Sequence, residues 1–373
     1  IVAWGECERI EVEGKERVSR AQRWWNNFCS RTSGDEPIAF SSFAFFTSPT
    51  QSVVIAPSVI VRRDQHGTRL TVVDIPEKLD ATTKQALTRI NGPHEVEVSH
   101  VDVEWLSGTR SIEEWQTSVD DAIARINNGE LDKVVLARDL VAKLDKSLNV
   151  GALLRSLNER FPECWTFAVD GLVGATPELL IRRAGEQVTS RVLAGTVRRS
   201  SDEDRDGALA LALLGSDKDQ EEHEYAVESV AEALAHHCTD MDVPKRPFIL
   251  RLANVQHLAT DITGELADAA PALALAAALH PTAAVCGTPT ERAKQVIREL
   301  EGMDRGRYSG PVGWFDQNGD GEFGIALRCA AIEDEQRTSL RLFAGCGIVA
   351  GSTSESEVAE SNAKFSAMRE SLV

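Results

Sequence analysis

The start of one helix, residues 216–225, constrains this chain most strongly. Ser216 is a good N-cap residue, and apolar residues recur downstream at helical spacing. Asp219, Glu222 and His223 are spaced i, i+3 and i+4, so they share one side of the predicted helix. A solvated acidic first turn is the alternative, because acidic residues are stabilised at the positive end of the helix dipole. A second stretch of the same kind favours a functional role.

That second stretch begins at Ser354, which forms a predicted capping box with Glu357. Glu357 and Glu360 repeat the i, i+3 spacing, so two helices each present a pair of carboxylates. Two such pairs can converge on one divalent cation. Ligand sets made only of oxygen favour Mg²⁺ over zinc, and Mg²⁺ usually keeps waters and takes substrate oxygens. We therefore predict a magnesium site, provided that the fold brings the two helices together.

The overall charge of the chain argues against several classes of partner. Among 373 residues, 58 are acidic and 40 are basic, which gives a formal charge of −18. Such a surface repels nucleic acids and anionic membranes, so we expect neither as a partner. No apolar run is long enough to span a membrane. Seven cysteines without a Cys-x-x-Cys pair and a start without a signal-like region predict a reduced, cytoplasmic protein.

Three further polar residues are candidates for chemistry. Lys133 opens a mostly apolar run; such a lysine either extends to solvent or is desolvated and able to act as a base. Glu178 follows Pro177 at the start of a strand, where a glutamate is usually on the surface. His257 lies within the predicted strand 249–262, where a core role is more common than a ligand role. The small-residue turn expected at 193–196 would let a ligand approach backbone N–H groups.

Other segments suggest structure rather than catalysis. Residues 1–95 are predicted to have a structural rather than a catalytic role, with β-rich runs at 52–62 and 68–75. Pro93–His94 is predicted to be a connector rather than a convincing domain boundary. Residues 111–114 form a capping box, and 268–280 is predicted as a buried helix. The acidic loop 316–322 is better explained by a hairpin turn than by an EF-hand, because position twelve would be Leu327. Gly345 and Gly347 indicate a close-approach loop without a dinucleotide fingerprint.

Taken in order, the motifs of this chain resemble those of the chorismate-utilising enzymes, which include the isochorismate, salicylate, anthranilate (component I) and aminodeoxychorismate synthases. The resemblance spans about residues 110–373, and the first 95 residues are compatible but less diagnostic. The matching motifs are Lys-Val-Val-Leu-Ala-Arg at 133–138, Thr-Pro-Glu at 176–178, Leu-Ala-Gly-Thr at 193–196, Asp-x-x-Glu-His at 219–223, Leu-His-Pro-Thr at 279–282, Tyr-Ser-Gly-Pro-Val-Gly-Trp at 308–314, Ala-Leu-Arg-Cys-Ala at 326–330, Ala-Gly-x-Gly-Ile-Val at 344–349 and Glu-x-x-x-Lys at 360–364.

This resemblance implies an α+β fold in which residues 1–373 form one large domain. Antiparallel sheets would form a central sandwich with helices outside, and the site would lie in a cleft of that domain. The implied partner is the small-molecule substrate chorismate, with Mg²⁺ as the cofactor. No obligate protein partner is implied, and we expect a monomer.

The resemblance also assigns roles to individual residues. Lys133 would be the base that activates water, and Glu178 the acid that protonates the departing hydroxyl group. Asp219, Glu222, Glu357 and Glu360 would form the magnesium cage, with Glu222 and Glu360 as the best direct ligands. Tyr308 and Arg328 would hold the enolpyruvyl carboxylate. The full set of implied substrate contacts is Gly195, Thr196, His257, Ala284, Val285, Tyr308, Leu327, Arg328, Phe343, Gly345 and Lys364.

Three positions favour the isochorismate synthases within this family. Lys133 indicates water as the nucleophile, because the members that use ammonia carry glutamine there. Ala284–Val285 is typical of isochorismate synthases, whereas salicylate synthases tend to have Thr-Ala. Val192 stands where salicylate and anthranilate synthases often have Glu-Pro. A bifunctional salicylate synthase is the main alternative, and an anthranilate or aminodeoxychorismate synthase is a weaker one. Two other classes are alternatives. The intact acid, base and cage residues argue against an inactive binding relative, and turnover of chorismate would separate both this relative and an unrelated Mg²⁺-dependent hydrolase from the favoured function.

Overall fold

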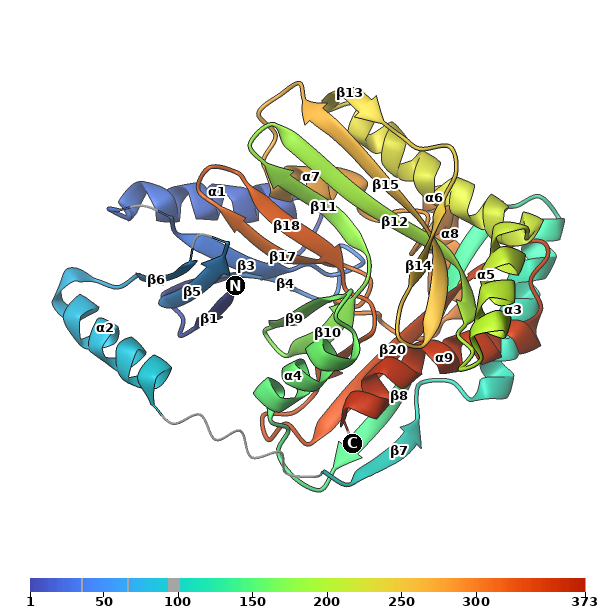
Figure 1. Cartoon of the computed structure of the whole chain (residues 1–373), viewed down its shortest axis with the longest axis horizontal. Helices are drawn as coiled ribbons and strands as arrows, with labels where there is room; N and C mark the ends of the chain where they lie inside the picture. Colours follow the sequence, from blue (N-terminus) through green and yellow to red (C-terminus); the bar gives the residue numbers. More distant parts are fainter. Residues whose placement is uncertain (35, 66, 93–100, 373) are drawn as a thin grey trace.

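The computed structural model describes residues 1–34, 36–65, 67–92 and 101–372. Within them the strands form three sheets in which every paired strand is antiparallel, and the helices lie outside the two larger sheets (Figure 1). The expected α+β fold with central antiparallel sheets and flanking helices is confirmed. The connector predicted at Pro93–His94 lies outside the described residues.

The seven-stranded sheet has two long strands at its centre. β8 (Lys133–Leu144) and β20 (Ser339–Ile348) pair along most of their length, with Gly347 opposite Val135. β16 (Gly287–Thr288) and β7 (Val103–Ser107) also pair with β8. The remaining strands follow β20 in the order β19 (Cys329–Ile332), β10 (Leu172–Thr176) and β9 (Trp165–Val169).

The ten-stranded sheet is built around β12 and β15. Its strands run in the order β13 (Cys238–Asp242), β15 (Val255–Leu266), β12 (Gln187–Arg198), β11 (Leu179–Ala184), β18 (Gly321–Ile325), β17 (Pro311–Asp316), β3 (Ile38–Ser42), β4 (Ser52–Ala56) and β2 (Glu8–Val12), and β14 (Phe248–Arg251) pairs with β15. A small third sheet contains β1 (Val2–Trp4), β5 (Val59–Asp64) and β6 (Gly67–Val72). None of the helices in the described ranges is long and apolar enough to cross a membrane.

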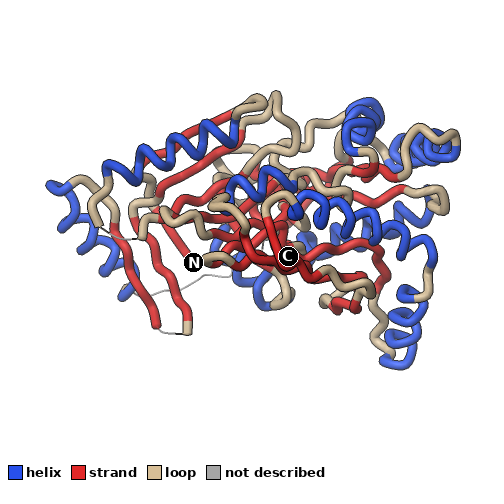
Figure 2. Tube along the Cα trace, turned by 90° about the horizontal axis from the view of Figure 1, so that it is seen from above, coloured by secondary structure: helices blue, strands red, loops and turns tan. Residues whose placement is uncertain are grey.

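The helices cover the sheets on their outer sides (Figure 2). α6 (Asp217–Ala235) packs on β12 and β15, α9 (Ser354–Leu372) on β20, α8 (Thr290–Leu300) on β8 and α7 (Ala272–Leu279) on β11 and β18. The other helices are α1 (Arg17–Arg31), α2 (Pro76–Asn91), α3 (Ile112–Asn127), α4 (Val150–Arg160) and α5 (Glu203–Leu214).

One cluster of buried apolar side chains joins the two large sheets and the helices on them. It includes Leu136 and Ile348 from the seven-stranded sheet, Val192 and Ile262 from the ten-stranded sheet, and Val230 from α6. Burying a side chain of this size contributes about 1.5–3 kcal/mol each. The shared core therefore fixes the end of β8 against the middle of β12, where the predicted site residues lie.

Several local predictions are confirmed, and others are wrong in detail. The capping box at Ser111 is present at the start of α3, and the loop after β17 forms a hairpin with Gly319 at φ +83°. α7 begins only at Ala272, because Pro271 occupies its N-cap position. The predicted strand 249–262 is instead a hairpin of β14 and β15, and the run 52–62 is divided between β4 and β5.

Two glycine-containing segments that we predicted as a turn and a loop lie inside strands. The predicted turn at 193–196 is a β-bulge within β12, where Gly195 takes φ +73° and the register against β15 shifts. Such bulges redirect side chains and are common beside active sites. Gly345 and Gly347 lie within β20, but the predicted close approach is present. A Cβ at Gly347 would overlap Glu222 Oε1, so a larger residue there would force the Glu222 carboxylate to move.

Candidate active site

A small cavity of about 60 Å³ lies where the two large sheets meet. Its walls come from β8, β12, β15 and β20, from α6 and α9, and from the segments that precede β11, β16, β17 and β19. Every substrate contact predicted from the sequence lines this cavity, as do Glu178 and Glu222. Sequence positions more than 160 residues apart are therefore brought to one place, as the antiparallel pairing of β8 with β20 and of β12 with β15 requires.

Lys133 is completely buried at the start of β8. Its Nζ atom lies 3.2 Å from Glu222 Oε1 and 3.4 Å from the Glu222 carbonyl oxygen, to which it donates a hydrogen bond. Of the two interpretations of this lysine, the structure excludes extension to solvent. Lys133 itself is not part of the cavity wall; its carboxylate partner Glu222 is.

Glu178 is buried between β10 and β11, not on the surface as a glutamate beside a proline usually is. Burial raises the pKa of its carboxyl group to about 8, although the charges of Lys133 and Lys364 oppose the rise. A carboxylic acid that keeps its proton near neutral pH can donate that proton to a leaving group. The residue thus has the property that its predicted role requires.

The two acidic helix starts do converge. Lys218 of α6 connects them, because its Nζ atom lies 2.9 Å from Glu357 Oε1 of α9. Burial raises the pKa of Asp219, and the neighbouring charges of Glu222 and Glu360 raise it further against the hydrogen bond to Ser216. The pKa of Glu357 is likewise raised by burial and then by Glu360. Carboxylates of both helices therefore repel one another within one cluster.

The start of α9 differs from our prediction by one residue. The helix begins at Ser354 itself, and Thr353 Oγ1 accepts a hydrogen bond from the backbone N–H of Ser356 at 3.3 Å. The cap is thus Thr353, and the predicted capping box at Ser354 is wrong. In α6 the predicted cap is present, since Ser216 accepts from the backbone N–H of Asp219.

The carboxylate cluster fits a hard cation. Glu357 Oε2 is buried and has no hydrogen-bond partner among the described residues, so this carboxylate oxygen is available as a ligand. One side-chain atom each of Cys346, Glu357 and Glu360 lies within 4.8 Å of the others. Burial raises the pKa of the Cys346 thiol well above its usual value, so it stays protonated and is a poor ligand. The remaining donors are carboxylate oxygens, the set that Mg²⁺ prefers over zinc.

A buried cation without a carboxylate partner faces the other side of the cavity. Arg328 has no ion pair with any described residue, and its Nη2 atom donates to His257 Nε2 at 3.1 Å. Burial, together with the charges of Arg328 and Lys364, lowers the pKa of His257 well below its usual value, so the ring is neutral. Because Nε2 accepts, Nδ1 carries the proton and faces Gly195 O at 3.2 Å and Thr196 Oγ1 at 3.1 Å. His257 thereby orients Arg328.

The rest of the wall is shaped by an aromatic pair and a lysine. The rings of Tyr308 and Phe343 stack with their centroids 4.9 Å apart. Lys364 lies 2.6 Å from Glu360 and donates a hydrogen bond to the carbonyl oxygen of Gly345 at 2.8 Å. This lysine joins the carboxylate cluster to the cavity that Arg328 faces.

Sequence reasoning missed Lys218, and it predicted a close approach at Gly347 without identifying Glu222 as the group that lies against it. Lys218 carries the positive charge that connects the two helices, and Gly347 leaves room for Glu222. The available signal for Lys218 was a lysine inside an otherwise acidic helix start.

The sequence pattern described as that of a chorismate binding enzyme matches residues 1–373. The chain belongs to the chorismate-binding enzyme family. Isochorismate synthase DhbC of Bacillus subtilis is 43% identical over 268 residues, which cover 69% of this chain and 67% of that protein. The salicylate biosynthesis isochorismate synthase of Pseudomonas aeruginosa is 34% identical over 396 residues, which cover 99% of this chain and 82% of the relative.

A solved structure agrees with this assignment. MenF, the menaquinone-specific isochorismate synthase from Escherichia coli, superposes with a TM-score of 0.83 at 29% identity, over 100% of this chain and 85% of that one. This chain is therefore an enzyme of the family, and the curated relatives most similar to it are isochorismate synthases.

Proposed function

We propose that this enzyme converts chorismate to isochorismate in a Mg²⁺-dependent reaction. The observation that carries the proposal is the buried Glu178, whose pKa of about 8 keeps a proton available on the wall of a cavity that buried cations also face. The names of the curated relatives support the same reaction.

In the proposed reaction, water adds to C2 of the ring while the C4 hydroxyl group departs. Lys133, when neutral, accepts a proton from the attacking water. Glu178 donates its proton to the leaving oxygen, so that one water enters, one leaves and the ring double bonds shift. Net composition is unchanged, as an isomerisation requires. Lys133 opens β8 and Glu178 lies in the segment between β10 and β11, which allows the base and the acid to act on different sides of the ring.

Substrate binding would require a local reversal of charge in an acidic protein. Arg328 and Tyr308 would hold the enolpyruvyl carboxylate, with the guanidinium oriented by His257. Glu222 and Glu360, with Asp219 and Glu357 beside them, would hold Mg²⁺, which when bound supplies positive charge for the ring carboxylate. Ala284 and Val285 line the cavity and would contact the ring. Because this pair is typical of isochorismate synthases, we expect isochorismate rather than salicylate as the product.

Chromatography of the products after incubation with chorismate and Mg²⁺ tests this proposal. We expect isochorismate with little pyruvate, and no product after EDTA treatment. Stoichiometric pyruvate together with salicylate would reassign the enzyme to the salicylate synthases. Full activity in EDTA would remove Mg²⁺ from the proposal, and no consumption of chorismate would refute it.

A further inference from the structure

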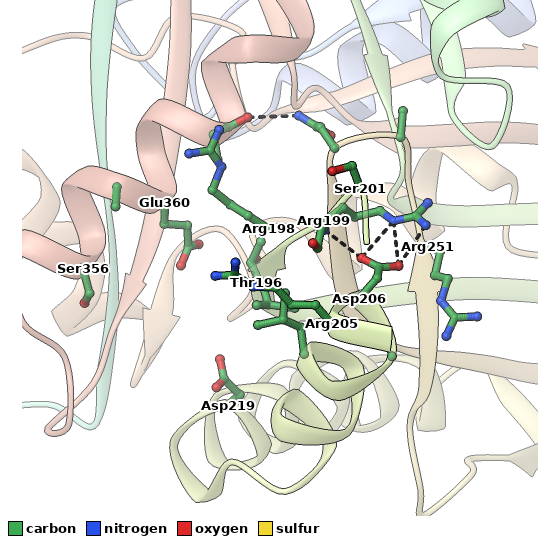
Figure 3. A pocket seen from close by; sticks show the side chains of 18 of the residues that line it. Thr196, Arg198, Arg199, Ser201, Arg205, Asp206, Asp219, Arg251, Ser356 and Glu360 are labelled. Atoms are coloured by element: carbon green, nitrogen blue, oxygen red, sulfur yellow. Dashed lines mark hydrogen bonds and ion pairs between the residues drawn. The ribbon is translucent and has the colours of Figure 1, made fainter. Parts of the chain in front are cut away.

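A second cavity of about 1390 Å³ adjoins the catalytic cavity (Figure 3). The two share Thr196 as a wall residue, and Asp219 and Glu360 lie at the same side of the larger one. The catalytic cavity is far below the ~300–1,000 Å³ of typical ligand sites, whereas the larger one can hold a small molecule. We call this larger cavity the vestibule.

The vestibule has an excess of positive charge that is not paired. Arg198, Arg205 and Arg251 line it, are exposed, and form no ion pair with any residue in the described ranges. They come from three different elements, the end of β12, the first turn of α5 and the end of β14. No single helix or strand therefore accounts for their grouping.

The other charges that line the vestibule largely compensate one another. Arg199 pairs with Asp206 at 2.9 Å, as Figure 3 shows, and Lys218 pairs with Glu357 at 2.9 Å. Glu360 pairs with Lys364. Only two lining carboxylates, Glu203 and Asp219, have no ion pair among the described residues, and Asp219 belongs to the proposed metal cage.

This local excess matters because the chain has a formal charge of −18. A dianion is repelled by such a molecule as a whole, and the repulsion is screened only beyond a Debye length of about 10 Å at 0.1 M salt. The unpaired charges that line the vestibule are three arginines against two carboxylates, and an excess of positive charge in a cleft raises the local concentration of anions and their association rate. Unpaired arginines beside the catalytic cavity supply such a field where it affects substrate capture.

We propose that the vestibule is a capture site for small dicarboxylate anions. Arg198, Arg205 and Arg251 attract the dianionic substrate, which then passes Thr196 into the catalytic cavity. The inference rests on the proposed function in one respect, because it assumes that the captured dianion is chorismate. It assigns a role to three arginines outside the catalytic cavity.

The test is the association rate constant of chorismate, measured by stopped-flow fluorescence with the full chain at several ionic strengths. In the triple variant Arg198→Gln/Arg205→Gln/Arg251→Gln, we expect the constant to fall about tenfold at low ionic strength. Its dependence on salt should also become weaker, while kcat changes less than twofold. A merely structural role of the arginines would not alter the salt dependence.

The matched control is Arg20→Gln/Arg23→Gln/Arg337→Gln, which removes the same charge from exposed positions outside both cavities. We expect its association rate constant to stay within twofold of the wild type. An equal loss in the control, or an unchanged constant in the vestibule variant, overturns the proposal. If chorismate binds but is not converted, the proposed function is wrong, and the association rate constants of the two variants still test the capture site. If chorismate does not bind, both proposals are wrong.

Discussion

At the residue scale, the site depends on ionisable groups that burial forces into unusual states. Glu178 is buried without a counter-charge in direct contact, Lys133 is buried against a carboxylate, and Arg328 is buried against a neutral imidazole. Burying an ionisable group is costly even when it is paired or neutralised, so each of these groups limits stability unless a substrate or ion compensates it. Such residues are more readily explained by catalysis than by folding.

We predict that Lys133→Gln lowers kcat by ~10²–10⁴-fold, the usual effect of losing a general base. Glutamine keeps hydrogen-bonding capacity at this buried position but cannot accept a proton from water. Chorismate should still bind, because Arg328 and the other predicted carboxylate contacts are elsewhere. Steady-state kinetics with an equilibrium binding measurement checks this, and a kcat near the wild-type value would make Lys133 a structural lysine.

The pKa of Glu178 predicts a pH effect on rate and on stability. The acid form is lost as the pH rises through about 8, so kcat should decline above that value. Since the folded pKa exceeds the ordinary value of 4.5, the folded state binds more protons between these limits, and the free energy of unfolding falls as the pH rises through that window.

Glu178→Gln should therefore lose activity but melt at a higher temperature than the wild type at pH 9, with little difference at pH 4. Thermal denaturation of both proteins across this range measures the effect. Equal melting curves at every pH would show that the carboxyl group is not held in its protonated form by the fold.

At the element scale, α6 and α9 act as a matched pair of carboxylate-bearing helices. Each begins with a hydroxyl cap, from Ser216 in α6 and from Thr353 in α9, so the first turn of each is fixed. Acidic residues there are also stabilised by the helix dipole. These local interactions, the hydroxyl caps and the helix dipole, thus order the first turns of α6 and α9 before any metal binds.

We predict that Glu222→Gln and Glu360→Gln each weaken Mg²⁺ affinity and abolish turnover without unfolding the protein. Metal titration followed by activity and circular dichroism measures both effects. Glu221→Gln and Glu355→Gln are matched controls on the same two helices, at exposed positions, and should titrate like the wild type. A normal Mg²⁺ response in both cage variants would place the metal elsewhere.

At the scale of the whole molecule, a buried ion pair connects the walls of the catalytic cavity. Arg305 pairs with Glu301 and donates hydrogen bonds of 2.8 Å to the carbonyl oxygens of Val285 and Val135, which both line the cavity. Glu301 in turn accepts from the backbone N–H of Ala137 at 2.7 Å. Removing one charge would leave the other buried and unpaired.

We expect Arg305→Met to lower the free energy of unfolding by ~3–5 kcal/mol, as the loss of one partner of a buried pair does. The double variant Glu301→Gln/Arg305→Met should recover part of this loss. Arg125→Met, which removes a partly exposed arginine that pairs with Asp121 and Glu299, should cost at most ~1 kcal/mol. Urea denaturation provides the comparison, and a loss as small as that of the control would contradict the structural role.

The sequence by itself determined the local structures and the chemical types at the site. Hydroxyl–carboxylate spacing predicted the start of α3, and Asn318–Gly319 predicted the hairpin after β17, because caps and turns depend on neighbouring residues. The motif order predicted the family, and every residue that it assigned as a substrate contact lines the cavity. The roles of these residues stay predictions that the variants above test.

Only the tertiary structure decided which charges meet. Nothing local distinguishes a lysine that extends to solvent from the buried Lys133, which lies against β16, β20 and α6. Nor does local sequence reveal that Lys218 reaches Glu357 on a helix 139 residues later in the chain. The bulge at Gly195 and the break between β14 and β15 likewise arise from pairing with other strands. Burial and ion pairing are set by long-range packing, and these decide the protonation of Glu178 and the excess of positive charge in the vestibule.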